Sequence, residues 1–193
     1  MTAWIAIALL ILVLILFYRI YASLIRYRNH ALEALSSIDV QLRQRHDLLP
    51  PILQLAQRFI THEKSLLTEV TQLRTEVQKS YTPTDPDAVQ QHLHNEAALQ
   101  NGMQRIFAVA ENYPELQSSA TFVQAQQTFN SVEGHIAAAR RFYNTAVTRL
   151  NNRVQIFPGS LVAKILRIRQ MPLFELESAE MRKPVHVDDF LAP

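Results

Sequence analysis

The sequence predicts an all-α protein in which an N-terminal transmembrane helix continues into a long antiparallel helical bundle. Three observations support this prediction. Residues 3–18 form a run of sixteen residues without a charge or a strongly polar group. The apolar residues that follow recur every seven positions over two long stretches, which is typical of helices that pack on other helices. The chain contains three glycines, far below the average usage of about 7%, whereas folds with many tight turns need more.

The apolar run predicts a membrane anchor. Together with residues 20–25 it is long enough to cross a hydrocarbon core of about 30 Å, because a helix rises about 1.5 Å per residue. Trp4 and Tyr18 stand at its two ends, at the depth of the lipid headgroups. All nearby positive charge follows the run, beginning at Arg19. This bias predicts a single pass with the N-terminus outside and the domain in the cytoplasm.

A cleaved signal peptide is the alternative to an anchor. It would need a positively charged region before the apolar run and a shorter apolar stretch of about 7–15 residues. The sequence shows neither property. We therefore predict a signal anchor over residues 1–25, a cytoplasmic bundle over residues 26–158 and a C-terminal amphipathic segment with a tail over residues 159–193.

Composition excludes several classes of function. The formal net charge of +2 and the lack of any Lys/Arg block argue against a nucleic-acid partner. The absence of cysteine excludes disulfides, thiolate catalysis and cysteine-type zinc sites. The part after the anchor, about 165 residues, has the size of one domain with a core of its own.

The first heptad repeat extends from Leu35 to Val77. It keeps its phase through Pro50 and Pro51, although interior prolines normally break or kink a helix. With Asp47 as an N-cap, both prolines would fall among the first helical positions, where N–H groups lack partners anyway. We predict one kinked helix over this stretch, and not two helices at a wide angle.

Two further long helices are predicted after this one. The first begins with Asp85 as N-cap and Pro86 in the first helical position, and it ends near Asn112. The second begins near Ser118–Ser119, ends near Ile156 and carries a large apolar residue at every seventh position, ending with Phe157. Residues 161–169 then alternate apolar and basic side chains, which predicts a short basic amphipathic helix.

Helix lengths predict self-association. The helix starting at Pro86, with about 27 residues, spans roughly 40 Å, whereas residues 24–79 as one helix would span roughly 84 Å. The shorter helix cannot cover the seam formed by Leu35, Ile38 and Leu42 near the membrane. An uncovered apolar seam is unstable in water. Either the C-terminal tail or a second copy of the chain should therefore cover it.

Two long motifs resemble the signature of the LemA family. The first comprises residues 37–50 (SIDVQLRQRHDLLP) followed by His62 and Glu63, and the second comprises Glu133, residues 136–144 (IAAARRFYN), Asn151 and residues 157–158. The resemblance implies a single N-terminal anchor, a long antiparallel bundle and residence in a bacterial membrane, in some cases a specialised internal membrane such as that of magnetosomes. It implies no established catalytic activity. The chain departs from the family pattern in having two prolines, at 50 and 51, where one is common.

Two charged residues interrupt the apolar seam, Arg45 and Glu63. They lie roughly 27 Å apart on a straight helix and cannot pair with each other. An unpaired buried charge costs several kcal/mol, so each needs a partner from another helix. Glu133 and Arg140 are the expected partners, with Arg140 assigned to Glu63. Such charges fix the register of the helices, bind a partner, or reach solvent and do neither.

No pattern predicts a metal site or a catalytic site. His62-Glu63 lacks the second histidine that a zinc protease motif requires one turn later. His92 and Glu96 are one turn apart, but no third ligand is evident, so we interpret them as part of an exposed polar face. No serine, histidine and aspartate occur in a recognisable nucleophile context. We predict no catalysis and no cofactor.

The function predicted from the sequence is a membrane-anchored scaffold or adaptor at the bacterial inner membrane. Its expected partners are membrane lipid, further copies of the chain and an unidentified membrane protein. The alternatives are a membrane-shaping oligomer that induces curvature and an enzyme or enzyme subunit. The candidate residues for partner binding or helix register are Asp39, Arg43, Arg45, Asp47, His62, Glu63, Glu133, Arg140, Tyr143 and Asn144.

Overall fold

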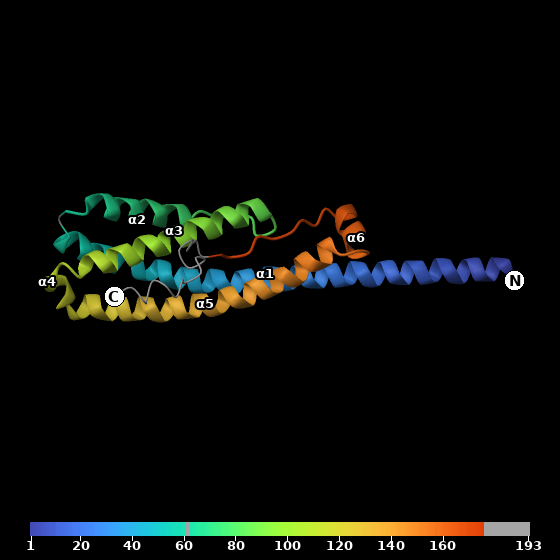
Figure 1. The fold of residues 1–193 in the computed structure, drawn as a ribbon, viewed down its shortest axis with the longest axis horizontal. Coiled ribbons are helices and arrows are strands. Elements are labelled where there is room, and N and C mark those ends of the chain that lie inside the picture. The colour runs from blue at the N-terminus through green and yellow to red at the C-terminus, as the bar shows by residue number, and fades with distance from the viewer. Residues whose placement is uncertain (61, 176–193) are drawn as a thin grey trace, which may run out of the picture.

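One long helix, α1 (Thr2–Phe59), spans the molecule, and the other helices pack along its C-terminal part (Figure 1). The structure is a computed structural model that describes residues 1–60 and 62–175. In these two ranges the chain forms six helices and no strand, so the predicted all-α class is confirmed. The helices that follow α1 are α2 (Lys64–Val77), α3 (Pro86–Ala110), α4 (Pro114–Gln117), α5 (Ala120–Gln155) and α6 (Gly159–Ile165).

The N-terminal part of α1 projects from the bundle as an apolar helix. Every residue from Met1 to Arg19 is exposed, and Leu24 is the first buried residue of the chain. By its length and composition, α1 is the one helix among the described residues that could cross a membrane. The helix is unbroken from this exposed segment into the bundle, as the sequence predicts.

The first helix is shorter than the heptad repeat predicts. It passes through Pro50 and Pro51 as helix and does not restart at Asp47, but it ends at Phe59. After a short turn, α2 begins at Lys64 and doubles back against α3 (Figure 1). The prediction of one helix continuing to Val77 was wrong. A seven-residue repeat specifies which face is buried, and it leaves the direction of the helix in space undetermined.

The other long helices begin where they are predicted to begin, and a side chain caps each of them. The Asp85 carboxylate accepts a hydrogen bond from the Asp87 N–H at 3.4 Å at the start of α3. The Ser119 hydroxyl accepts one from the Phe122 N–H at 3.4 Å at the start of α5. These side chains satisfy N–H groups that have no partner inside the helix. Short connections then make α1, α2, α3 and α5 alternate in direction along one bundle (Figure 1).

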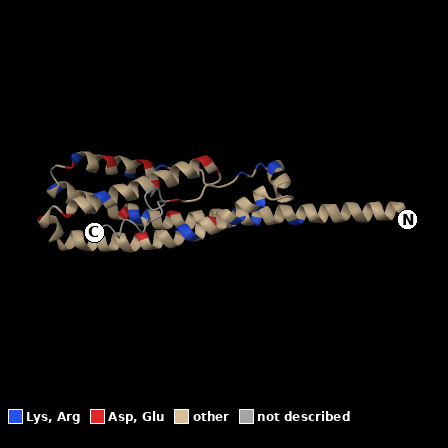
Figure 2. Cartoon of the chain, in the orientation of Figure 1, with Lys and Arg blue, Asp and Glu red and all other residues tan. Residues whose placement is uncertain are grey.

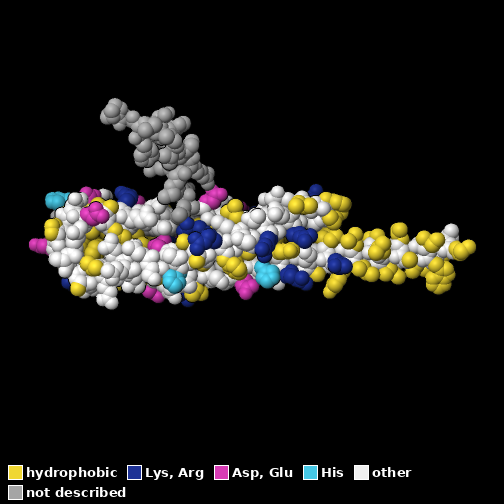
Figure 3. Space-filling model, turned by 60° about the horizontal axis from the view of Figure 1, so that its bottom comes forward, with side chains coloured by type: hydrophobic (Ala, Val, Ile, Leu, Met, Phe, Trp, Pro, Cys, Tyr) yellow, Lys and Arg dark blue, Asp and Glu magenta, His cyan; other side chains and the backbone are white. Residues whose placement is uncertain are grey.

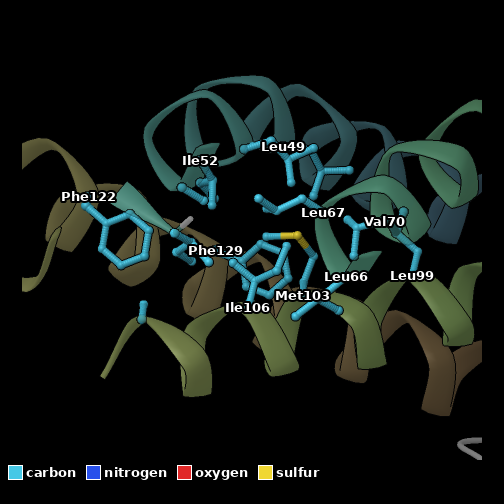
Figure 4. Packing of buried hydrophobic residues seen from close by; sticks show 14 of the residues in the cluster. Leu49, Ile52, Leu66, Leu67, Val70, Leu99, Met103, Ile106, Phe122 and Phe129 are labelled. Carbon is cyan, nitrogen blue, oxygen red and sulfur yellow. The ribbon is translucent and has the colours of Figure 1, made fainter. Parts of the chain in front are cut away.

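The end of the bundle away from the apolar segment is filled by interlocking side chains of α1, α2, α3 and α5 (Figure 4). Phe107 packs edge-on against Phe129, with ring centroids 5.2 Å apart. Gly102 permits the close approach of α2 and α3, because a Cβ at this position would lie 2.7 Å from Val70 Cγ2. The short helix α2 is thereby fitted against α3 without a gap.

The seam nearest the apolar segment is covered within the same chain. Leu35, Ile38 and Leu42 are buried against α5, against the first half of α3 and against Met171 and Phe174 of the C-terminal segment. The prediction that the tail or a second copy must cover the seam was wrong in part. It rested on the lengths of α1 and α3 and did not include α5. The C-terminal segment contributes to the cover, and α5 supplies most of it. Self-association stays a prediction, and the helix lengths no longer support it.

Helix α6 lies beside α1 at the end of the bundle nearest the apolar segment. Its Val162 and Ala163 pack on Leu24. The helix ends at Ile165, short of the predicted residue 169, and Arg167 follows with a positive φ of 54°. Phe157, the last position of the second heptad repeat, lies in the turn before α6 and is exposed. The predicted C-terminal segment 159–193 is described to residue 175, and its remainder lies outside the described residues.

Candidate functional site

Arg45 is a buried guanidinium at the level where α1, α3 and α5 meet. It donates hydrogen bonds to Oε2 of Glu96, to the Glu96 backbone carbonyl at 3.1 Å and to Oε1 of Glu133 at 3.0 Å. The side chains of Arg45 and Glu96 are 0% exposed, and that of Glu133 is 16% exposed. Because a buried charge needs hydrogen-bonding partners, this cluster fixes three helices at one level.

The Glu96 carboxylate is shared between two basic side chains. Its second oxygen, Oε1, lies 2.8 Å from Nε2 of His46. Burial alone would raise the pKa of Glu96, but the hydrogen bond from His46 and the charge of Arg45 outweigh burial and lower the pKa below its usual 4.5. Glu96 is therefore an ionised carboxylate inside the bundle.

A cleft of about 450 Å³ opens beside this cluster, between α1, α3 and the connection from α2 to α3. The Tyr81 hydroxyl donates to the carboxylate of Asp39 at 2.9 and 3.0 Å across the cleft wall. The Tyr81 ring stacks on His92, with centroids 4.1 Å apart. Burial and the neighbouring Asp39 charge raise the pKa of Tyr81, so its phenol stays protonated as a donor. Arg43 and Asp47 are exposed residues of the same wall.

His92 completes the inner part of the cleft. Its Nε2 lies 3.6 Å from Oδ1 of Asp39 and 3.9 Å from Oε1 of Glu96, which is beyond hydrogen-bond distance in both cases. Within residues 1–60 and 62–175, no three His, Asp or Glu side chains are placed to hold a metal ion. The cleft offers charged groups of both signs to a partner.

Two asparagines of α5 hold the C-terminal segment on the bundle. The Asn144 side chain donates to the Phe174 carbonyl at 3.1 Å and accepts from the Phe174 N–H at 2.8 Å. Asn151, seven residues later, makes the same pair of bonds with the backbone of Met171, both at 2.9 Å. The Tyr143 hydroxyl donates to the carbonyl of Pro172 at 2.8 Å. These side chains satisfy backbone groups that belong to no helix.

The model of the LemA family matches residues 34–189, which is most of the chain. The chain belongs to the LemA family. It is 24% identical over 175 residues to a relative named Protein LemA from Metamycoplasma hominis, and the alignment covers 88% of this chain and 77% of that relative. The resemblance seen in the two motifs is confirmed. The LemA family is not a known enzyme family.

The first LemA motif contributes to the buried cluster and to the cleft. The predicted pairing of Arg45 with Glu133 is confirmed. Asp39, Arg43 and Asp47, which are among the candidate residues for partner binding, all line the cleft. The second motif contributes Glu133 to the cluster, while its Tyr143, Asn144 and Asn151 bind the C-terminal segment.

The predicted pairing of Glu63 with Arg140 was wrong. His62 and Glu63 lie in the turn between α1 and α2, and both are exposed. The heptad position of Glu63 does not face a core, because the helix that would have buried it has already ended. Arg140 instead places its guanidinium over the ring of Phe174, 4.5 Å from the centroid. Burial lowers the pKa of Arg140, and the nearby Glu133 charge opposes this effect.

Sequence reasoning missed the central acid of the site. Glu96 and His92 were interpreted as an exposed polar face, which was wrong, since Glu96 is fully buried and His92 is nearly so. The spacing of α3 contains the missing signal. Glu96 falls between Leu93 and Gln100 in the 4-3-4-3 series of buried positions that begins at Val89 and continues to Met103.

Proposed function

We propose that this LemA-family protein is a membrane-anchored scaffold or adaptor of the bacterial inner membrane that performs no catalysis. The continuity of α1 is the observation that carries this proposal. The same helix presents an exposed apolar segment up to Tyr18 and supplies Arg45 to the buried cluster. A partner bound to the bundle would therefore be held at a set distance from the bilayer, without a flexible linker between anchor and binding surface.

The cleft is the proposed docking surface. Arg43 and Asp47 are exposed on the wall of the cleft, while Asp39 is engaged by Tyr81. Arg43 and Asp47 lie one turn apart on α1, so together they present one positive and one negative charge in a fixed order. The proposed partner is a membrane protein whose cytoplasmic segment presents the opposite order of charges. Charge order of this kind selects a partner more than it increases affinity.

A charge exchange tests the docking surface. The double substitution Arg43→Asp with Asp47→Arg keeps the net charge and reverses the order of the charges. Proteins cross-linked to the full chain in native membranes should be identified for the wild type and for this variant. We expect one membrane protein to be lost with the exchange, because like charges would then face each other.

The matched control is the exchange Glu69→Arg with Arg105→Glu. These two residues form an exposed ion pair between α2 and α3, outside the cleft. The control should retain the cross-linked protein and an unchanged melting temperature. If no protein is enriched over the control membranes, or if the Arg43/Asp47 exchange retains the same protein, the adaptor proposal fails.

The proposed orientation places the bundle in the cytoplasm. It rests on Arg19, Arg26 and Arg28, which all follow the apolar run. A reporter fused after Pro193 should be active only in the cytoplasm. Activity in the periplasm would reverse the orientation and exclude a cytoplasmic partner.

A further inference from the structure

The end of the bundle nearest the apolar segment exposes a group of large apolar side chains. Ile156 and Phe157 of the α5–α6 turn and Leu161 and Ile165 of α6 are 58–77% exposed. Among the described residues, they are half of the large apolar side chains that are exposed beyond Tyr21. Figure 3 shows hydrophobic side chains at the end of the bundle that faces the apolar part of α1. A concentrated apolar patch of this kind indicates a contact surface.

The depth of this group along the anchor is fixed by packing. Val162 and Ala163, on the other side of α6, pack on Leu24, and Ile20 is partly buried against the same cluster. Leu24 lies six residues after Tyr18, which is roughly 9 Å along a helix. When the apolar run occupies the hydrocarbon core, α6 is therefore placed at the level of the lipid headgroups, where amphipathic helices bind.

Basic residues predominate around this group. Residues 1–32 and 134–174 contain ten Lys and Arg residues and no Asp or Glu. Figure 2 shows Lys and Arg residues near α6 and the base of the apolar segment. Arg169 is paired with Asp85 and Asp87, whereas Arg19, Lys164 and Arg167 have no ion pair within the described residues. Unpaired basic side chains at headgroup depth attract anionic lipids.

We propose that the α5–α6 turn and α6 form a second membrane contact beside the anchor. In this contact Ile156, Phe157, Leu161 and Ile165 insert into the lipid interface, and Lys164 and Arg167 bind the phosphate groups of anionic lipids. The inference rests on the proposed anchoring of α1. With two points of contact, the tilt of the bundle relative to the bilayer is fixed as well as its distance from it.

Site-directed spin labels can measure this contact. The chain has no cysteine, so each engineered cysteine carries the single label. Full-length Phe157→Cys and Leu161→Cys report on the proposed contact. Phe142→Cys is the matched control, because Phe142 is the same residue type, is 59% exposed and lies on α5 farther from α6. The proteins are reconstituted into vesicles of phosphatidylcholine, alone or mixed with phosphatidylglycerol.

We expect the labels at positions 157 and 161 to be several-fold less accessible to an aqueous nickel reagent than the label at position 142, and several-fold more accessible to oxygen dissolved in lipid. Both differences should increase in the mixed vesicles. Lys164→Glu with Arg167→Glu should abolish this increase. An equal depth in both vesicle types would overturn the assignment of Lys164 and Arg167 to anionic lipid.

Two other outcomes separate the inference from the anchoring on which it rests. Brominated lipids report on the anchor through the fluorescence of Trp4, the single tryptophan. If the fluorescence of Trp4 is quenched while the label at position 157 is accessible to water, the second contact is overturned and the anchor stays intact. If the fluorescence of Trp4 is not quenched, the anchor itself is overturned. A label at 157 that is shielded from both reagents would assign the patch to a second copy of the chain and overturn the lipid contact.

Discussion

Arg45 and Glu96 form a hydrogen-bonded ion pair in which neither side chain is exposed to solvent. The pair joins the helix that carries the apolar segment to a helix of the bundle, and Glu133 extends it to a third helix. Glu69 and Arg105 form a second ion pair between helices, but both of these side chains are largely exposed. The two pairs allow a direct comparison of buried and exposed charges in one protein.

Removing one member of the buried pair should destabilise the protein strongly. Arg45→Met leaves two carboxylates without their cation, and we expect a loss of about 3–5 kcal/mol in the free energy of unfolding. Arg105→Met, the exposed control, should cost less than about 1 kcal/mol. Thermal and chemical unfolding of the full chain in detergent, followed by circular dichroism, measures both. Equal losses for the two substitutions would show that water reaches Arg45.

Glu96 should make the stability of the protein sensitive to acid. Its pKa in the fold lies below the usual 4.5, because His46 and Arg45 stabilise the ionised form against the effect of burial. A carboxylate with a lowered pKa stabilises the fold above its unfolded pKa, and this contribution is lost as the pH falls through the folded value. The melting temperature of the wild type should therefore fall more steeply below pH 4.5 than that of Glu96→Gln. Glu69→Gln should keep the steep wild-type profile.

The C-terminal segment should be released when its asparagine partners are removed. Asn144→Ala leaves the N–H and carbonyl of Phe174 without partners, and each lost hydrogen bond costs about 1 kcal/mol. We expect faster chymotrypsin cleavage after Leu173 and Phe174 in both Asn144→Ala and Asn151→Ala. The exposed neighbour Asn152→Ala is the control and should be cut at the wild-type rate. Unchanged rates in all three variants would mean that Tyr143 and the packing of Met171 and Phe174 hold the segment without the asparagines.

Two helical glycines should respond in opposite directions to alanine. Gly102→Ala places a Cβ against Val70, so we expect a destabilisation of about 1–3 kcal/mol as α2 and α3 move apart. Gly134→Ala meets nothing within 4 Å on α5 and should stabilise the protein by about 0.5–1 kcal/mol through higher helix propensity. Denaturant unfolding of both variants measures the signs. A stabilising Gly102→Ala would show that Val70 moves aside at little cost.

The local features of the fold follow from short stretches of sequence. The cap at Asp85 and the helix start near Ser118–Ser119 were predicted because such signals depend on neighbours a few residues away. The pairing of Arg45 with Glu133 was predicted because a charge inside an apolar seam requires an opposite charge on a facing helix. Asn144 and Asn151 appeared in the sequence as motif positions, but their partners in the C-terminal segment could not be predicted without the fold.

The sequence by itself determined the apolar segment, the helical class, the cap at Asp85 and the need for a partner at Arg45, because each depends on periodicity, composition or adjacent residues. The tertiary structure decided that the chain turns after Phe59, that Glu63 is exposed, that Glu96 is central and that α5 covers the seam of α1. These outcomes depend on which helices meet in space. Several arrangements satisfy the same heptad pattern, and the packing of all the helices together selects one of them.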